Sequence, residues 1–197
     1  MGCAPSSPEG STADADASSL PHAAPTIRSD RYYTRVVFLD VDGVLHTGVN
    51  NHARHLFHEH CMANLREIVH GPLADVGIVL SSSWRSTQRQ VDEVNEQLKQ
   101  HSIALLVGAT QLDGFKSRSD EILSWVEAHP RVKSFVALDD MDLSKPHGDR
   151  FAQNFVHVDV DVALTKADAE RALAILSRPL DRATMPRAAR GVNPHPS

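Results

Sequence analysis

The sequence is short of the features that mark secreted, membrane-spanning or nucleic-acid-coating proteins. It has only two cysteines in 197 residues, Cys3 in a polar stretch and Cys61 in a helical pattern, so we expect no disulfide framework and a reducing compartment. No run approaches the roughly 20 apolar residues that cross a bilayer, and the N-terminus is too polar for a secretory signal peptide. A formal net charge of -5 disfavours general binding to nucleic acid, which depends on neutralising phosphates. These absences predict a cytoplasmic protein.

The chain is long enough for one domain between two polar ends. Its hydrophobic content of 41% provides a core of ordinary size, and we find no internal repeat. Residues 1–30 are rich in Ala, Ser, Pro and Asp, and residues 178–197 contain many Pro and Arg, without an apolar period in either segment. Both ends are therefore predicted to be disordered, and the ordered domain is predicted to span residues 31–177.

The first residues, Met1 to Ser6, fit the M-G-x-x-x-[ST] pattern for N-myristoylation, with a cysteine beside the glycine. One myristoyl chain binds membranes weakly, so stable anchoring needs a second chain, which palmitoylation of Cys3 would supply. In a eukaryotic host we expect acylation of Gly2 and Cys3 and peripheral association with the cytoplasmic face of a membrane. The alternative is a chance match, since the pattern is short and Pro5 can hinder the transferase.

Strand-like and helix-like segments alternate along the domain. The expected strands cover residues 35–39, 75–80, 103–107, 134–138 and 155–158. The expected helices cover residues 57–69, 88–100, 120–128 and 166–176. Thr87 with Gln90 and Thr165 with Asp168 are predicted to cap two of these helices. Such alternation predicts a doubly wound, Rossmann-like α/β fold in which helices cover both faces of a parallel sheet.

Polar residues follow three of the expected strands. Asp40 and Asp42 follow the first strand, Ser81, Ser82 and Ser83 follow the second, and Asp139, Asp140 and Asp142 follow the fourth. Ligands of parallel sheets bind beyond the carboxyl ends of the strands. All three groups are therefore expected at one edge of the sheet.

Asp40 and Asp42 provide the strongest chemical signal in the chain. They lie in the run Val36–Leu45, where apolar residues lead into Asp40 and Gly43 interrupts the extended segment. A buried carboxylate needs a cation, a hydrogen-bond network or a catalytic task. At a spacing of two, both side chains leave the same face of a strand, which suits a nucleophile beside a general acid/base. A glycosyltransferase-type D-x-D metal site is an alternative, but it leaves the serine and later acidic groups without roles.

The run Val36–Leu45 resembles motif I of the haloacid dehalogenase-like (HAD) phosphohydrolases. Those proteins carry, in order, D-x-D, a Ser or Thr after a strand, a Lys or Arg before a helix, and an acidic pair after another strand. This chain has all of them, and the patterns D-V-D-G-V-L, S-S-S-W-R, R-x-D-E-I-x-x-W and L-D-D-x-D are similar to the HAD domain of Swiss army knife RNA repair proteins. The resemblance implies a capless Mg²⁺-dependent phosphatase. Spacing independently leaves no room for a cap domain between residues 42 and 81 or between residues 83 and 116.

The resemblance also implies catalytic roles. Asp40 would attack phosphorus and form an aspartyl-phosphate, and Asp42 would protonate the leaving oxygen and later deprotonate the attacking water. The Ser81 hydroxyl and the Ser82 amide would bind phosphoryl oxygens. Arg85 would bind the substrate phosphate or brace the acidic pair, although an ordinary surface arginine is the alternative.

The cation and the metal ligands are less fully specified. Lys116 and Arg118 both precede the helix expected from residue 120, and either would shield the charge of Asp40. Lys116 ranks first by residue type. Mg²⁺ prefers hard oxygen ligands and shares them with a substrate phosphate. The implied protein ligands are the Asp40 carboxylate, the Asp42 carbonyl and Asp139, with Asp140 or Asp142 completing the shell.

Histidines are concentrated between residues 46 and 60. Zinc sites usually pair such residues with a second ligand cluster at a defined spacing, and none is evident. We therefore expect a polar loop and helix face at the mouth of the site, formed by His46, His52, His55, His58 and His60.

The leading hypothesis is a phosphatase for a phosphate monoester. Without a cap, the site is predicted to admit a large substrate, such as a polynucleotide end or a phosphoprotein, although no RNA-binding module is attached. The alternative is a catalytically silent HAD-fold binding module tethered at a membrane, and the intact pair of Asp40 and Asp42 argues against it. The oligomeric state stays open.

Overall fold

The computed structural model describes residues 27, 33–47, 57–112, 114 and 116–188. In this part of the chain, five parallel strands form a sheet with the order β3-β2-β1-β4-β5. The strands are β1 (Arg35–Leu39), β2 (Val76–Leu80), β3 (Leu106–Ala109), β4 (Ser134–Asp139) and β5 (Phe155–His157). The helices are α1 (Glu59–His70), η1 (Ser83–Ser86), α2 (Gln88–Gln100), α3 (Arg118–Ala128), α4 (Asp149–Ala152) and α5 (Lys166–Leu176).

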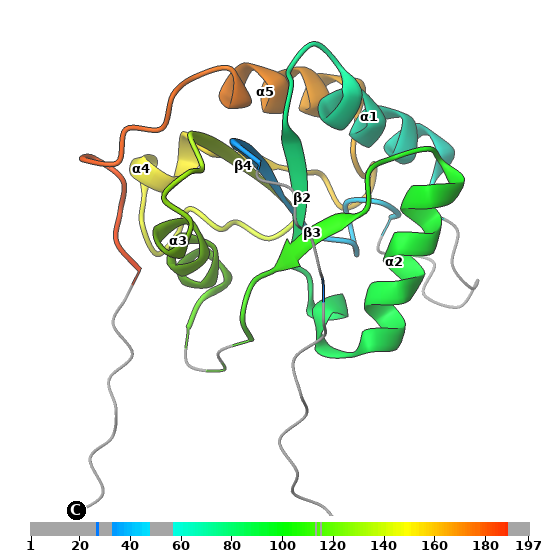
Figure 1. Ribbon diagram of the computed structural model, residues 1–197, viewed down its shortest axis with the longest axis horizontal. Coiled ribbons are helices and arrows are strands. Elements are labelled where there is room, and N and C mark those ends of the chain that lie inside the picture. The colour runs from blue at the N-terminus through cyan, green and yellow to red at the C-terminus, as the bar shows by residue number, and fades with distance from the viewer. Residues whose placement is uncertain (1–26, 28–32, 48–56, 113, 115, 189–197) are drawn as a thin grey trace, which may run out of the picture.

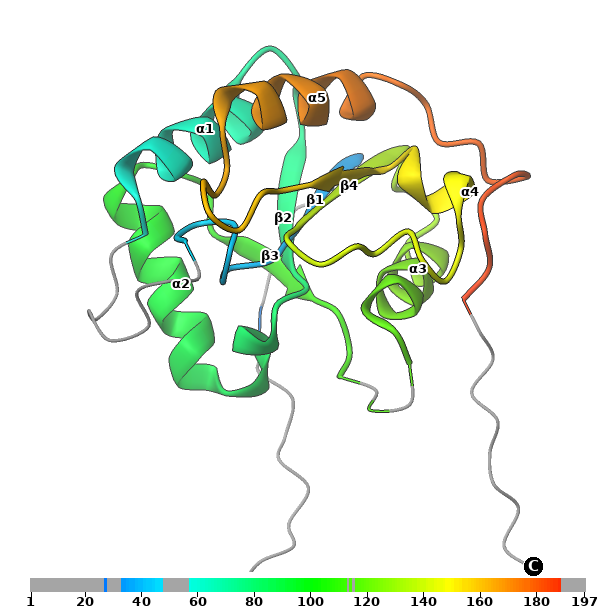
Figure 2. The ribbon, with the colours of Figure 1, turned by 180° about the vertical axis from the view of Figure 1, so that it is seen from behind.

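The predicted doubly wound α/β fold is confirmed, with helices on both faces of the sheet (Figures 1 and 2). Val37 and Leu39 of β1 belong to the core shared with α1, α2 and α5, whereas Val36 and Phe38 belong to the core shared with α3 and α4. Successive strand residues point to opposite faces, so β1 is buried on both sides. A strand covered on both faces becomes a continuous apolar run, which is why the sequence places β1 correctly.

Two helices begin and end where the sequence predicts. The Thr87 hydroxyl accepts a hydrogen bond from the Gln90 amide at the start of α2, and Thr165 and Asp168 form a reciprocal capping box at the start of α5. These caps satisfy backbone amides that have no partner within the helix. The local capping signal is therefore sufficient to position both helices.

The third strand is displaced from its predicted position at residues 103–107. Ile103 instead lies in the turn that follows α2, where its amide donates to the Leu98 carbonyl at 2.8 Å. Strand β3 is Leu106–Ala109 and includes Gly108, a poor strand former. A β-carbon at Gly108 would lie 3.6 Å from the Trp125 ring, so this position packs closely against α3. Tertiary packing, which the local sequence does not encode, decides this strand.

The C-terminal segment after α5 packs against the domain. The sequence places the end of the ordered domain at residue 177, whereas Leu180 and Met185 contact the core beside α3 and α4. The Leu180 amide donates to the Lys133 carbonyl at 2.6 Å, and Arg182 donates to three carbonyls at and just after the end of α3. Among the described residues, packing against the domain therefore extends beyond residue 177, as far as Ala188. The segment was predicted to be disordered because its apolar residues are isolated and follow neither a helical nor a strand period.

Neither connection around the strand ends has room for an inserted domain. Residues 40–58 join β1 to α1, and residues 110–117 join β3 to α3. Segments shorter than about 40 residues rarely form a stable domain of their own. The capless architecture is therefore confirmed.

The predicted acylation positions, Gly2 and Cys3, lie outside the described residues. Within the residues that the structure describes, no helix combines the length and apolar character needed to cross a membrane.

Candidate active site

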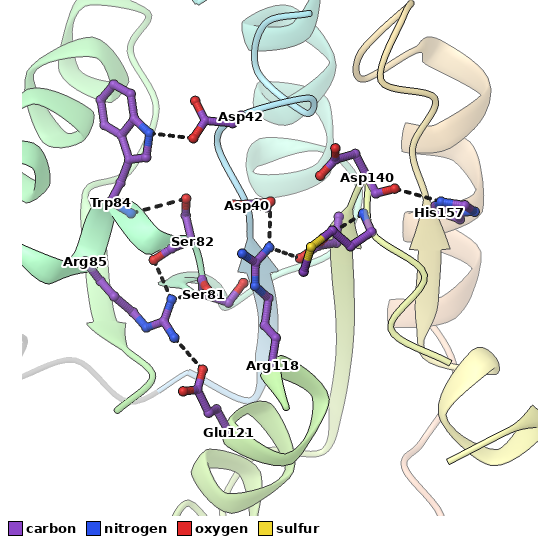
Figure 3. Close-up of polar contacts among 12 residues, drawn as sticks. Asp40, Asp42, Ser81, Ser82, Trp84, Arg85, Arg118, Glu121, Asp140 and His157 are labelled. Carbon is purple, nitrogen blue, oxygen red and sulfur yellow. Dashed lines mark hydrogen bonds and ion pairs between the residues drawn. The ribbon is translucent and has the colours of Figure 1, made fainter. Parts of the chain in front are cut away.

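The ends of β1, β2 and β4 bring the predicted polar groups together (Figure 3). Leu39 is in register with Leu80 on one side and Leu138 on the other, so the residues that follow emerge side by side. The Ser81 amide donates to the Leu39 carbonyl, and the Asp40 amide donates to the Leu138 carbonyl, each at 3.0 Å. The polar edge predicted from the sequence is thus present.

Three carboxylates converge at this edge. Asp40, Asp139 and Asp140 each offer an oxygen, and these oxygens lie within 4.8 Å of one another. Asp40 is 4% exposed and Asp139 is fully buried. Burial raises the pKa of Asp139 and of Asp140, and the charge of Asp40 raises both further. Buried carboxylates that repel one another suit a hard divalent cation, which would bind them and relieve the repulsion.

Asp140, and not Asp142, completes this acidic cluster. Gly43 has a φ of +77°, and a β-carbon there would lie 2.6 Å from the Asp140 carboxyl carbon, so glycine permits the approach. His157 Nε2 lies 2.8 Å from the Asp140 carbonyl oxygen and fixes the backbone. Asp142 instead accepts hydrogen bonds from the amide and hydroxyl of Ser144 and closes a local turn.

Arg118 places a cation between two of the carboxylates. Its Nη1 lies 2.6 Å from Asp40 Oδ2 and 2.5 Å from Asp139 Oδ2. Burial opposes the charged form, but the charges of Asp40 and Asp139 outweigh it and raise the pKa of Arg118. Lys116, which the sequence ranks first, lines a cavity with Trp125 beside α3. Arg118 is therefore the residue that the structure shows in contact with Asp40, and the three-dimensional path of each side chain, which the sequence does not give, decides this.

Arg85 braces the serine loop through contacts within the protein. Its Nε donates to the Thr110 carbonyl at 3.2 Å, and its Nη1 donates to the carbonyls of Ser81 and Ser82. Its Nη2 forms an ion pair with Glu121, and both side chains are buried. These contacts engage the guanidinium within the protein and favour the bracing role over the phosphate-binding role, both of which the sequence left open. Glu121 lies within the pattern R-x-D-E-I but was not predicted to belong to the site.

Two buried hydroxyls lie at the edge without a hydrogen-bond partner among the described residues, Ser81 Oγ and Thr110 Oγ1. Leaving a buried polar group unpaired costs about 1–3 kcal/mol. The two residues follow neighbouring strands, and the Thr110 amide donates to the Leu80 carbonyl just before Ser81. A hydroxyl beside carboxylates and a cation is suited to donate a hydrogen bond to an oxygen of a bound ligand. Ser81 was predicted, whereas Thr110 was missed because the end of β3 was misplaced.

Asp42 is held from two sides. Trp84 Nε1 donates to Asp42 Oδ2, and His46 Nε2 lies 3.0 Å from Asp42 Oδ1. The His46 hydrogen bond lowers the pKa of Asp42, and the same bond raises the pKa of His46. The Phe57 ring stacks on His46 and also contacts Trp84, which fixes both donors. The side chain of Asp42 is 50% exposed, so it can exchange protons with a substrate or solvent.

The other four histidines predicted at the mouth of the site fall into two groups. His52 and His55 lie outside the described residues. His58 and His60 lie at the N-terminal end of α1, where they adjoin Cys61. Cys61 was predicted as part of a helix and was not grouped with the histidines.

Comparison with known proteins gives one match. The family model described as HAD domain in Swiss Army Knife RNA repair proteins matches residues 36–169, which include all the polar groups at the sheet edge. No curated protein and no solved structure matches the chain.

Proposed function

The chain belongs to the family of HAD domains in Swiss Army Knife RNA repair proteins, and we propose that it is an Mg²⁺-dependent phosphatase with Asp40 as nucleophile. The observation that supports this most is the surroundings of Asp40. This buried carboxylate contacts Arg118 and lies in an acidic cluster at the strand ends. The unpaired hydroxyl of Ser81 follows the adjacent strand. A nucleophile, a countercharge and a free hydroxyl are the parts that phosphoryl transfer needs.

Asp40 and Asp42 would divide the reaction between them. Asp40 attacks phosphorus and forms an aspartyl-phosphate, while the bond from phosphorus to the leaving oxygen breaks and Asp42 gives that oxygen a proton. A water then attacks the phosphorus and transfers a proton to Asp42, which releases inorganic phosphate and restores Asp40. Trp84 and His46 hold Asp42 in place for both proton transfers.

The phosphoryl oxygens would be bound by Ser81 and Arg118. The Ser81 hydroxyl gains the partner that it lacks, and Arg118 offsets the charge of Asp40 as the dianionic phosphate approaches. The ligands of Mg²⁺ would be the carboxylates of Asp40, Asp139 and Asp140 with the Asp42 carbonyl. When bound, Mg²⁺ supplies Lewis-acid neutralisation of charge on the phosphate.

The substrate that we propose is a phosphate monoester on a large molecule, with a polynucleotide end ahead of a phosphoprotein. Neither connection around the site is long enough to hold an inserted cap domain, which supports a large substrate. The family description supports a polynucleotide end. A panel of 3'-phosphorylated oligonucleotides, phosphopeptides and nucleotides would rank these classes by kcat/KM.

The decisive experiment measures phosphate release from an aryl phosphate by the full chain with Mg²⁺. Asp40→Asn should abolish release and abolish an acid-stable, hydroxylamine-sensitive phosphoryl label on the protein. Asp142→Asn is the matched control, because this aspartate caps a turn outside the acidic cluster, and it should retain activity. Unchanged release by Asp40→Asn would overturn the proposal. Binding of phosphorylated ligands without turnover would support the silent binding module, for which acylation of Gly2 and Cys3 would provide the membrane tether.

A further inference from the structure

A second cluster of metal-ligating side chains lies at the N-terminal end of α1. Its members are His58, His60 and Cys61, whose donor atoms all lie within 4.8 Å of one another. His58 is the residue before the helix, and His60 and Cys61 lie in its first turn. Because these residues share no member with the acidic cluster, they form a separate candidate site.

The donors in this cluster select a different class of ion from the acidic site. Two imidazoles and one thiol suit Zn²⁺ and similar ions, whereas Mg²⁺ prefers oxygen. The Cys61 Sγ lies 3.2 Å from His60 Nε2. Sulfur and nitrogen ligands of one tetrahedral Zn²⁺ lie roughly 3.5 Å apart, given their usual bond lengths. The observed spacing therefore needs only a small adjustment to accept the ion.

Two possible hydrogen-bond partners lie close to His60 Nε2. Its Nε2 lies 3.2 Å from Cys61 Sγ and 3.4 Å from the Val162 carbonyl oxygen. In a neutral ring this nitrogen either accepts from the thiol or donates to the carbonyl, and in the second case the sulfur receives only a weak contact. A bound ion satisfies the nitrogen and the sulfur together and leaves a fourth position for a carbonyl or water.

The surrounding structure holds the ligands in place. Asn64 Nδ2 donates to the Leu164 carbonyl at 2.9 Å, which ties α1 to the segment that leads into α5 (Figure 2). The His58 amide donates to the Leu45 carbonyl at 2.8 Å, which ties the start of α1 to the turn after β1. Cys61 is fully buried, and burial raises the pKa of its thiol to about 11, so it is not a reactive surface thiol.

We propose that His58, His60 and Cys61 bind one ion of the Zn²⁺ class. The ion would bridge three side chains within residues 58–61, at the N-terminal turn of α1. This part of α1 also contacts the turn after β1 and the segment before α5. This role is structural, and it is independent of the proposed phosphatase chemistry.

The test uses Co²⁺ as a spectroscopic probe on the metal-free full chain carrying Asp40→Asn, which impairs the acidic site. We expect a thiolate-to-cobalt charge-transfer band in the near ultraviolet with tetrahedral bands in the visible, all displaced by Zn²⁺. Cys61→Ser should remove the charge-transfer band. His60→Ala should weaken binding by more than the roughly tenfold that loss of an outer-shell partner costs.

Two controls keep the result specific. Cys3→Ser changes the other cysteine and should leave the spectrum intact. His60 is exposed, so His60→Ala should fold like the parent chain even if Cys61→Ser does not. The absence of a thiolate band, or a band that survives Cys61→Ser, would overturn the proposal. Because the readout is a spectrum of an inactive variant, failure here leaves the phosphatase proposal untouched.

Discussion

The indole nitrogen of Trp84 donates a hydrogen bond to Asp42 Oδ2 at 3.0 Å. This bond connects the segment that follows β2 to the segment that follows β1. Trp84 is itself fixed, because the Ser82 hydroxyl accepts from its amide and caps η1. The serine loop therefore has two tasks in the proposed mechanism. It offers an unpaired hydroxyl at Ser81, and it orients the half-exposed carboxylate that transfers protons.

Trp84→Phe should lower kcat/KM by about tenfold, because a hydrogen bond to a charged group contributes about 1.5–3 kcal/mol and tenfold in rate corresponds to about 1.4 kcal/mol. The phenyl ring retains most contact with Phe57, so the free energy of unfolding should change little. Steady-state kinetics on an aryl phosphate, with urea denaturation in parallel, would measure both. Trp125→Phe, which alters a tryptophan packed against Phe38 in the opposite core, should leave kcat/KM unchanged. Equal losses in the two variants would contradict a specific role for the indole.

The Asp42–His46 pair should stabilise the fold only in an intermediate pH window. The pKa of Asp42 is lowered, so its contribution exists above its unfolded pKa and is lost as pH falls through the folded pKa. The pKa of His46 is raised, so its contribution is complete below its unfolded pKa and is lost as pH rises through the folded pKa. The difference in stability between wild type and His46→Ala should therefore be largest at roughly pH 4–6.5.

Denaturation with urea across that pH range would measure the difference, which we expect to stay below about 1 kcal/mol because the pair is partly solvated. His46→Gln keeps a neutral donor and serves as the control, since it should lose only the pH-dependent part. In His46→Ala, titration of Asp42 by carboxyl NMR should also show a higher pKa than in wild type. A stability difference that does not vary with pH would show that the pair is not charged in the folded state.

Local sequence predicts the strand ends well, but it predicts poorly the contacts between residues that lie far apart in the sequence. Val36–Leu39 is apolar because both faces of β1 are covered, so the position of Asp40 can be read directly from the run. The pairing of Arg85 with Glu121 joins residues on separate elements, and no local period encodes it. No local period encodes the hydrogen bond between Trp84 and Asp42 either. What the sequence cannot supply is the direction in which a side chain reaches once the backbone has been placed.

Arg118→Ala should reduce kcat/KM by about a hundredfold or more, because it removes the cation beside Asp40 and Asp139. Lys116→Ala tests the ranking favoured by the sequence and should change kcat/KM by less than about threefold, since Lys116 lines a cavity beside Trp125 and charges outside the acidic cluster contribute little. Steady-state kinetics with saturating Mg²⁺ would measure both variants. Arg118→Lys separates charge from geometry and should recover part of the loss. A larger loss of kcat/KM in Lys116→Ala than in Arg118→Ala would instead identify Lys116 as the cation that shields Asp40.

Removing one member of the buried Arg85–Glu121 pair should destabilise the fold strongly. Glu121→Ala leaves the Arg85 charge buried without its partner, and such changes cost about 3–5 kcal/mol. The double substitution Arg85→Met with Glu121→Met removes both charges and should be less damaging than Glu121→Ala. Urea denaturation of the variants would give the free energies of unfolding. A double variant that is no more stable than Glu121→Ala would show that the brace acts through the backbone carbonyls instead.

Gly43→Ala should weaken Mg²⁺ binding beyond its effect on folding. The residue has a positive φ, which costs a residue with a β-carbon about 1–2 kcal/mol. The added carbon would also lie 2.6 Å from the Asp140 carboxyl carbon, so this carboxylate must move away from Asp40 and Asp139. Isothermal titration with Mg²⁺ should therefore show a loss of affinity of at least about tenfold, as expected when a ligand is displaced.

Gly148→Ala provides a control that separates backbone strain from the displaced carboxylate. Gly148 also has a positive φ, of +60°, but a β-carbon there would meet nothing within 4 Å. Gly148→Ala should therefore lose stability in urea while its affinity for Mg²⁺ stays at the wild-type level. If both variants bind Mg²⁺ as wild type does, Asp140 is not a ligand, because its displacement by the alanine at position 43 would then have no consequence for the ion. If both lose affinity equally, general destabilisation explains the effect, and the contact between Gly43 and Asp140 has no specific role in shaping the site.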